Sequence, residues 1–319
     1  MRLKILGLLL LLPLIAPAAP PPGIPDGWSS SYVYGNGIRI HYYRATPAPG
    51  KPVMVMVHGV TDIGLHWKIL TSKLQDDYDV YMLDTRGHGL SDPFTSSDDG
   101  DTLVKDVVAF LETMKIEKPI LMGHSMGAAT VMRLGAEHPD LARAIIMLDP
   151  GLGRRTPPPT SGERAAGGGA PPAPPPPPRS VAPDRLVVSM RGTPEVLVAQ
   201  NNYPFDDLVA TCRRQSPKWS LESCQYWALS KKQYHGPYTD QTWQAMSGTV
   251  RIEGALAKIQ VPALILKADV PAETRKIHEE IASVMPNGRL VHIEGGGHNL
   301  HHDEPERTLQ VLHEFLSTL

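Results

Sequence analysis

Residues 119–137 read PILMGHSMGAATVMRLGAE, which is a short apolar run, a serine between glycines and a helix-forming segment in direct succession. The residues Gly123–Gly127 match the pattern G-x-S-x-G. Glycine on both sides of Ser125 allows a cramped strand-to-helix turn, a nucleophile elbow, that presents the serine at the carboxyl edge of a sheet. The amino end of the following helix favours negative charge near this serine. We therefore predict a strand over 119–122, a helix over 126–137 and a nucleophile at Ser125.

Apolar runs and helical segments alternate on both sides of this turn. Continuous apolar runs suit strands that are covered on both faces, as in a parallel sheet, and their alternation with helices is typical of a wound α/β fold. A Gly35-Asn36-Gly37 turn also predicts a hairpin over 32–45. The expected strands are 53–57, 80–83, 119–122, 144–148, 263–266 and 289–293, and the expected helices are 65–74, 103–114, 126–137, 273–284 and 304–319.

The alternation is interrupted after the sixth expected strand. Residues 151–183 are rich in Gly, Pro, Ala and Arg and have almost no large apolar side chain, so we expect a disordered linker. Residues 184–255 contain three tryptophans and have helical character, and we expect them to form a helical cap. The sheet domain would then comprise 19–150 and 256–319.

The amino-terminal residues have the order of a secretory signal. Arg2 and Lys4 precede an apolar run over 5–15, and small residues follow it. This run has 11 residues, whereas a bilayer span needs about 20. We expect a signal peptide over 1–18 and a secreted or periplasmic protein with no stable membrane span; an uncleaved anchor is the alternative.

Composition and cysteine usage narrow the choice of partners. The chain has 41% apolar and 20% charged residues, as globular proteins do, and 31 Lys and Arg against 33 Asp and Glu give a net charge of −2. Such a chain has no global field that would hold nucleic acid. Outside the cytosol, Cys212 and Cys224 can form a disulfide, and two buried thiols are the alternative. We expect a small-molecule substrate and neither a metal nor a cofactor, and the oligomeric state stays open.

The base that would activate Ser125 is expected to be a histidine late in the chain. A serine hydroxyl is a poor nucleophile until a base accepts its proton. His298 follows the last expected strand on a loop with three glycines, which lets the loop bend into a shared site. We therefore predict His298 as the base. His301 and His302 are expected to be exposed or to cap the next helix.

Together these motifs resemble the α/β-hydrolase superfamily. The resemblance implies an eight-stranded, mostly parallel sheet with a cap domain after the sixth strand. The residues that carry it are His58-Gly59 after the third strand, the segment DTRGHGLS at 84–91, the Ser125 turn and Gly297-His298, and they span 32–150 and 261–319.

The resemblance also implies an oxyanion hole, in which backbone N–H groups stabilise the charge that develops on the carbonyl oxygen. By position its donors are the N–H groups of Met126 and Val60, with Thr61 as the near alternative to Val60. The segment 84–91 is expected to be a structural brace in which Arg86 pairs with Asp84.

Two aspartates are candidates for the acid that would orient His298. In the superfamily this acid commonly follows the seventh strand as Gly-x-x-Asp, but here that segment reads Lys267–Pro271 (KADVP) and lacks the glycine. Asp269 could still serve in a shortened loop. The superfamily's other placement is the end of the sixth strand, where Asp149 lies. We favour Asp149 and keep Asp269 as the alternative.

This set predicts a serine hydrolase that cleaves a carboxylic ester or lactone through a Ser-His-Asp triad and an acyl-enzyme. An aspartate nucleophile would indicate an epoxide hydrolase or haloalkane dehalogenase, and Ser125 argues against both. A C–C bond hydrolase, a perhydrolase or an acyltransferase could use the same residues. A catalytically silent binding protein with this fold is the alternative of another class. The aromatic residues of the cap are compatible with a bulky or aromatic substrate, although aromatic residues at helical spacing more often only pack the cap itself.

Overall fold

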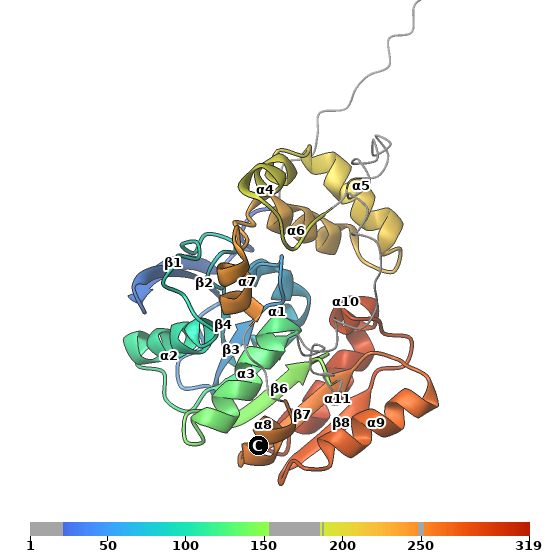
Figure 1. Cartoon of the computed structure of the whole chain (residues 1–319). Helices are drawn as coiled ribbons and strands as arrows, with labels where there is room; N and C mark the ends of the chain where they lie inside the picture. The colour runs from blue at the N-terminus through green and yellow to red at the C-terminus, as the bar shows by residue number, and fades with distance from the viewer. Residues whose placement is uncertain (1–21, 153–185, 187, 248–251) are drawn as a thin grey trace, which may run out of the picture.

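The computed structural model describes residues 22–152, 186, 188–247 and 252–319 (Figure 1). The expected signal peptide (1–18) lies outside the described residues, and so does the expected linker apart from residues 151 and 152.

Within the described residues, eight strands form one sheet in the order β1-β2-β4-β3-β5-β6-β7-β8. The pairs β1–β2 and β2–β4 are antiparallel and all the others are parallel, so the predicted eight-stranded, mostly parallel sheet is confirmed. The strands are β1 (Ser29–Gly35), β2 (Ile38–Arg44), β3 (Val53–Val57), β4 (Asp79–Leu83), β5 (Ile120–His124), β6 (Ala144–Leu148), β7 (Ala263–Lys267) and β8 (Gly288–His292).

Helices cover both faces of the sheet, because the central strands are apolar on both sides. One face packs against α2 (Thr102–Met114), α3 (Met126–Glu137), α8 (Ile252–Ala255) with the short η3 (Leu256–Lys258), and α9 (Ala272–Ala282). The other face packs against η1 (Gly64–Trp67), α1 (Lys68–Leu74), α10 (Leu300–Asp303) and α11 (Pro305–Leu316). In the part of the chain that the structure describes, no helix is long and apolar enough to cross a membrane.

The cap follows the sixth strand, as predicted. It contains α4 (Pro194–Asn201), α5 (Phe205–Gln215), α6 (Leu221–Lys232) and α7 (Asp240–Ser247). Figure 1 shows α4, α5 and α6 gathered above the sheet domain, while α7 lies lower, near α2. A disulfide joins Cys212 of α5 to Cys224 of α6, with an S–S distance of 2.06 Å.

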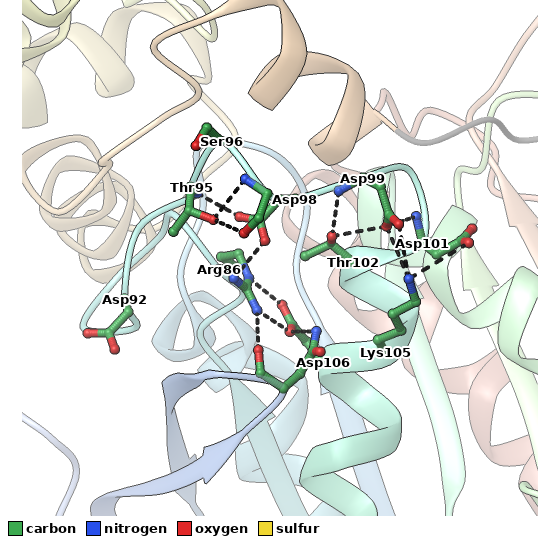
Figure 2. Close-up of polar contacts among 12 residues, drawn as sticks. Arg86, Asp92, Thr95, Ser96, Asp98, Asp99, Asp101, Thr102, Lys105 and Asp106 are labelled. Carbon is green, nitrogen blue, oxygen red and sulfur yellow. Dashed lines mark hydrogen bonds and ion pairs between the residues drawn. The ribbon is translucent and has the colours of Figure 1, made fainter.

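The loop after β4 is held by a buried cluster of charges around Arg86 (Figure 2). The Arg86 guanidinium donates to Asp98 Oδ1 at 2.9 Å, to Asp106 Oδ1 at 2.7 Å and to the Asn36 carbonyl at 2.9 Å. These bonds tie the loop to α2 and to the β1–β2 turn. The loop is thus braced as expected, but by partners other than Asp84.

The expectation that Arg86 pairs with Asp84 is wrong. Asp84 instead accepts hydrogen bonds from His41 Nδ1 at 2.7 Å and from the backbone N–H of Gly64 at 2.7 Å. The chain folds back over the Asp84 carboxylate so closely that a Cβ on Gly89 would lie 2.1 Å from it. Asp84 is therefore fully enclosed by its own loop and the hairpin, while Arg86 points toward α2.

Candidate active site

Ser125 lies on the turn between β5 and α3, in a conformation that only close packing around it allows. Its φ is 51° and its ψ is −111°, which is rare for a residue with a side chain. A Cβ on Gly123 would lie 2.2 Å from the Gly127 carbonyl oxygen, and a Cβ on Gly127 would lie 2.0 Å from that of Val57. Both glycines are therefore required, and the turn holds the serine at the carboxyl end of β5.

His298 and Asp149 complete a line of contacts from this serine. Ser125 Oγ lies 3.0 Å from His298 Nε2, and His298 Nδ1 donates to Asp149 Oδ2 at 2.5 Å. The imidazole side chain is 54% exposed, whereas the Asp149 carboxylate is 10% exposed. The structure thus brings together three of the predicted residues, with the acid buried and the imidazole within reach of solvent.

Asp149 is held as an anion by the end of a neighbouring strand. Its carboxylate accepts from the Ala268 N–H at 3.1 Å and pairs with Lys267 Nζ at 2.5 Å. Burial by itself would raise the pKa of Asp149. The hydrogen bond from His298 and the charge of Lys267 outweigh burial and hold that pKa well below its ordinary value. Lys267 was not singled out in the sequence, although a lysine that ends the apolar strand ALILK beside β6 was a usable signal.

Asp269 lies in the same region but faces another way. It pairs with Arg275 of α9, and it accepts the Gly295 N–H at 2.9 Å. Its own N–H donates to the Gly296 carbonyl at 2.7 Å. Asp269 therefore supports the glycine loop before His298, and the structure brings Asp149, not Asp269, to the imidazole.

The loop after β3 lies directly against the serine turn. A Cβ on Gly59 would lie 3.2 Å from Ser125 Cβ, and the side chains of Val60 and Met126 pack in one small apolar cluster around Phe94. The Thr61 N–H donates to His88 Nε2 at 3.1 Å. Because the Thr61 N–H already donates to His88, the geometry favours the Val60 N–H over the Thr61 N–H as the candidate oxyanion donor beside that of Met126.

Two buried histidines, His58 and His88, make hydrogen bonds to the loop after β3. His58 Nδ1 donates to the Gly59 carbonyl at 2.7 Å and its Nε2 accepts the Thr85 N–H at 3.1 Å. His88 Nδ1 donates to the Arg86 carbonyl at 2.9 Å. Burial lowers the pKa of both rings, so they stay neutral and can accept these backbone hydrogen bonds. The expectation for 84–91 thus holds in this sense: His88 supports the candidate site without facing it.

The expectation that His301 and His302 are exposed or cap a helix is wrong, since both are buried. The short helix α10 turns them inward, where His301 stacks on Trp67 at 5.0 Å and His302 stacks on His66 at 3.8 Å. Their apolar ring faces fill the space between η1 and the cap. Sequence patterning could not show this, because three successive polar residues on one turn give no periodic signal.

His124, the residue before the nucleophile, also contributes to the site. Its Nε2 donates to the His298 carbonyl at 2.9 Å, and the two rings lie 4.8 Å apart. Burial lowers the pKa of His124 to about 4, so this ring is neutral at pH 7. His124 therefore connects the serine turn to the loop that carries the imidazole.

A cleft of about 360 Å³ opens beside His298, between the cap and the glycine loop. Trp219 Nε1 donates to Asp303 Oδ1 at 2.8 Å, and Asp303 Oδ2 accepts the Gly297 N–H at 2.9 Å. The cap is thereby attached to the residue before His298. The cleft is lined by Gln215, Ser216, Pro217, Lys218, Trp219, Gly295, Gly297, His298, Asn299 and Asp303.

No group of three or more His, Cys, Asp or Glu side chains that could hold a metal ion is present in the described part of the chain.

Several known proteins are similar to this chain in sequence or in structure. Residues 54–311 match the sequence model of a family described as the alpha/beta hydrolase family. The N-formylmaleamate deformylase of Pseudomonas putida is 27% identical over 293 residues, which cover 89% of this chain and 95% of that protein. Epoxide hydrolase 1 of Caenorhabditis elegans is 22% identical over 306 residues, covering 93% of this chain and 72% of that protein. The structure of a putative aryl esterase from Burkholderia cenocepacia superposes with a TM-score of 0.62 at 21% identity, covering 91% of this chain and 98% of that one.

Proposed function

Because the chain belongs to the alpha/beta hydrolase family, we propose that it is a serine hydrolase that cleaves a carboxylic ester or lactone through an acyl-enzyme. The observation that carries this proposal is the line of contacts from Ser125 Oγ to His298 Nε2 at 3.0 Å and from His298 Nδ1 to Asp149 at 2.5 Å. A hydroxyl, a base and a buried carboxylate in this order are what nucleophilic acyl transfer requires.

In this mechanism Ser125 Oγ attacks the carbonyl carbon while His298 accepts its proton. Asp149 keeps His298 in the tautomer with the proton on Nδ1 and stabilises the imidazolium that forms. The N–H groups of Val60 and Met126 stabilise the oxyanion, and the amino end of α3 adds a favourable potential. His298 then protonates the leaving alcohol, and water, activated by the same imidazole, hydrolyses the acyl-enzyme.

An epoxide substrate fits this site poorly, although one relative is named an epoxide hydrolase. Attack on an epoxide carbon by Ser125 Oγ would give an ether, which water does not hydrolyse under mild conditions. An aspartate nucleophile would instead give an ester that water can cleave. The identity of the nucleophile therefore favours a carbonyl substrate over an epoxide.

An amide bond is the second candidate for the scissile bond. The observation that favours it is the match to N-formylmaleamate deformylase, which extends over 95% of that protein. An amide needs the same nucleophile and base, but its leaving nitrogen must be protonated before the C–N bond breaks. C–C bond hydrolysis, perhydrolysis and acyl transfer stay possible outcomes, since they share the acyl-carbon chemistry.

The test compares the wild-type protein with Ser125→Ala. A fluorophosphonate probe should label the wild type and not the variant, and only the wild type should hydrolyse p-nitrophenyl esters of varied chain length and aromatic lactones. Matched aryl esters and anilides then separate the ester from the amide candidate by kcat/KM. Equal labelling of both proteins would reject the enzyme proposal and favour a binding protein.

We also propose that the protein is exported, which rests on the order of residues 1–18. The disulfide between Cys212 and Cys224 supports an oxidising compartment. Mass spectrometry of the amino-terminal peptide, with the protein purified from culture supernatant or periplasm, tests this. A full-length, intracellular protein would contradict it.

A further inference from the structure

Lys231 on α6 of the cap is a lysine in an unusual place. It is buried, with 3% of its surface exposed, although an ammonium group loses much of its hydration there. Its Nζ donates to the Thr61 carbonyl at 2.5 Å and to Thr61 Oγ1 at 2.9 Å, and it lies 4.9 Å from the centre of the Trp227 ring. Both hydrogen bonds cross from the cap to one residue of the loop after β3.

Thr61 needs external support to keep its conformation. Its φ is 63°, which is unfavourable for a β-branched side chain. The His88 ring holds its N–H, and Lys231 holds its carbonyl and hydroxyl oxygens. Fixing both ends of Thr61 fixes the peptide between Val60 and Thr61. The Val60 N–H belongs to the next peptide toward β3, so its direction is restrained through the Val60 backbone rather than held directly.

The surroundings of Lys231 favour the ammonium form at neutral pH. Burial lowers the pKa of Lys231 only to about 8, because the nearby negative charge of Asp62 opposes the effect of burial. The Asp62 carboxylate is itself held by His66 Nδ1 at 2.7 Å and by the Ile63 N–H at 2.9 Å. The group that reaches Thr61 is therefore a charged donor, which makes stronger hydrogen bonds than a neutral one.

We propose that Lys231 is a positioning residue that couples the cap to the oxyanion hole by holding Thr61, and through it the Val60 N–H. This inference rests on the proposed function. It explains why a charged side chain is buried under α6 and directed at the loop after β3, where an apolar side chain would pack at lower cost.

The adjacent residue on the same helix provides a matched control. Lys232 Nζ also donates to two carbonyl groups, those of Asn201 at 2.8 Å and Tyr203 at 2.7 Å, but both belong to the cap. Lys231→Met and Lys232→Met each remove one ammonium and two hydrogen bonds while keeping an unbranched side chain. Only the first removes a link to the oxyanion loop.

For Lys231→Met we expect a kcat about 10- to 100-fold lower with little change in KM. This is a smaller effect than the roughly 10²- to 10³-fold loss caused by removing an oxyanion donor outright, because the donor is still present but less well held. Lys232→Met should keep a kcat close to that of the wild type. Equal losses in both variants, or a change in KM alone in Lys231→Met, would overturn the proposal.

A second measurement tests the oxyanion hole itself. A trifluoromethyl ketone adds to Ser125 and places an oxyanion in the hole, whereas the matching unreactive ether only occupies the site. In Lys231→Met the affinity for the ketone should fall in parallel with kcat, and the affinity for the ether should not. Unchanged affinity for the ketone alongside a lower kcat would contradict the proposal.

Thr61→Val covers the case in which Lys231→Met does not fold, as judged by circular dichroism. This change is isosteric, keeps the carbonyl acceptor and removes only the hydroxyl, so we expect a smaller decrease in kcat in the same direction. Wild-type kinetics in Thr61→Val, when Lys231→Met cannot be measured, would reject the proposal. Ser125→Ala keeps the two questions apart, because hydrolysis that survives that change rejects the proposed function whatever Lys231 does.

Discussion

Three residues of the candidate active site have backbone conformations that residues with side chains rarely adopt. Thr61, Ser125 and Asp149 have φ values of 63°, 51° and 44°. They lie after the ends of β3, β5 and β6, which are neighbours in the sheet. Such conformations persist only where the surrounding structure enforces them, and they gather at functional sites. Their grouping here is an observation independent of the G-x-S-x-G pattern.

The first prediction concerns the acid. Asp149→Asn should lower kcat by about 10⁴-fold, because an asparagine cannot hold the Nδ1–H tautomer of His298 or stabilise its imidazolium. Asp269→Asn should have a mild effect, since Asp269 contacts Arg275 and the Gly295 N–H rather than the imidazole. Steady-state kinetics on an activated ester measure both. Similar mild losses in the two variants would mean that neither is the triad acid.

At the scale of elements, buried charge clusters fix where loops cross. The second prediction concerns Arg86, whose side chain is 3% exposed between Asp98 and Asp106 (Figure 2). Arg86→Met should lower the free energy of unfolding by about 3–5 kcal/mol, because it leaves two buried carboxylates without their partner.

The matched control for Arg86 is Arg39→Met, which removes the exposed pair with Asp92. Exposed pairs contribute little to stability, so this variant should unfold close to the wild type. Urea denaturation followed by circular dichroism compares the two. If both variants lose the same small amount, the Arg86 cluster is not a brace.

The third prediction concerns the disulfide of the cap. Cys212 and Cys224 are 12 residues apart, so replacing both by alanine should lower the stability of the cap by about 3 kcal/mol through the freed loop entropy. Trp219 lies in this loop and packs against both cysteines, so its fluorescence should report the loss.

A reducing agent should reproduce this effect in the wild type and should have none on the double alanine variant. Because Trp219 donates to Asp303, which holds the Gly297 N–H, kcat should fall in parallel with the loss of the cap. Unchanged urea midpoints in the reduced wild type would contradict the prediction.

At the scale of the whole molecule, several neutral histidines are buried around the site. Burial lowers the pKa of His58, His88, His124, His301 and His302 below their ordinary value of 6.5. In the unfolded chain these rings take up protons as the pH falls below about 6.5, whereas in the folded chain they stay neutral to a lower pH. Proton binding then favours the unfolded state, so stability is lost with falling pH.

The fourth prediction is therefore a decrease in the free energy of unfolding from about pH 6.5 downward, with a slope of about 1.4 kcal/mol per pH unit for each such histidine. For His124 the window extends to its folded pKa of about 4. His302→Phe keeps the stack on His66 and should flatten the slope. His313→Phe at an exposed position of α11 provides the matched control for the exchange of side chains. Urea titrations between pH 7.5 and 4.5 measure all three proteins.

Local patterns determined most of the architecture. The ranges 53–57, 126–137 and 144–148 agree with β3, α3 and β6. The reason is physical: apolar periodicity and the steric demands of glycine act over a few residues, so they are readable without knowing the fold. The serine turn belongs to this class, because its two glycines are required by the turn itself.

Only the tertiary structure decided which distant groups meet. Asp149 rather than Asp269 reaches His298, Arg86 pairs with Asp98 and Asp106, and the lysines at 231 and 267 are buried beside the site. Each of these outcomes depends on how loops at the ends of separate strands approach one another. That approach is set by the packing of the whole sheet, its helices and the cap, and short-range patterns carry no information about it.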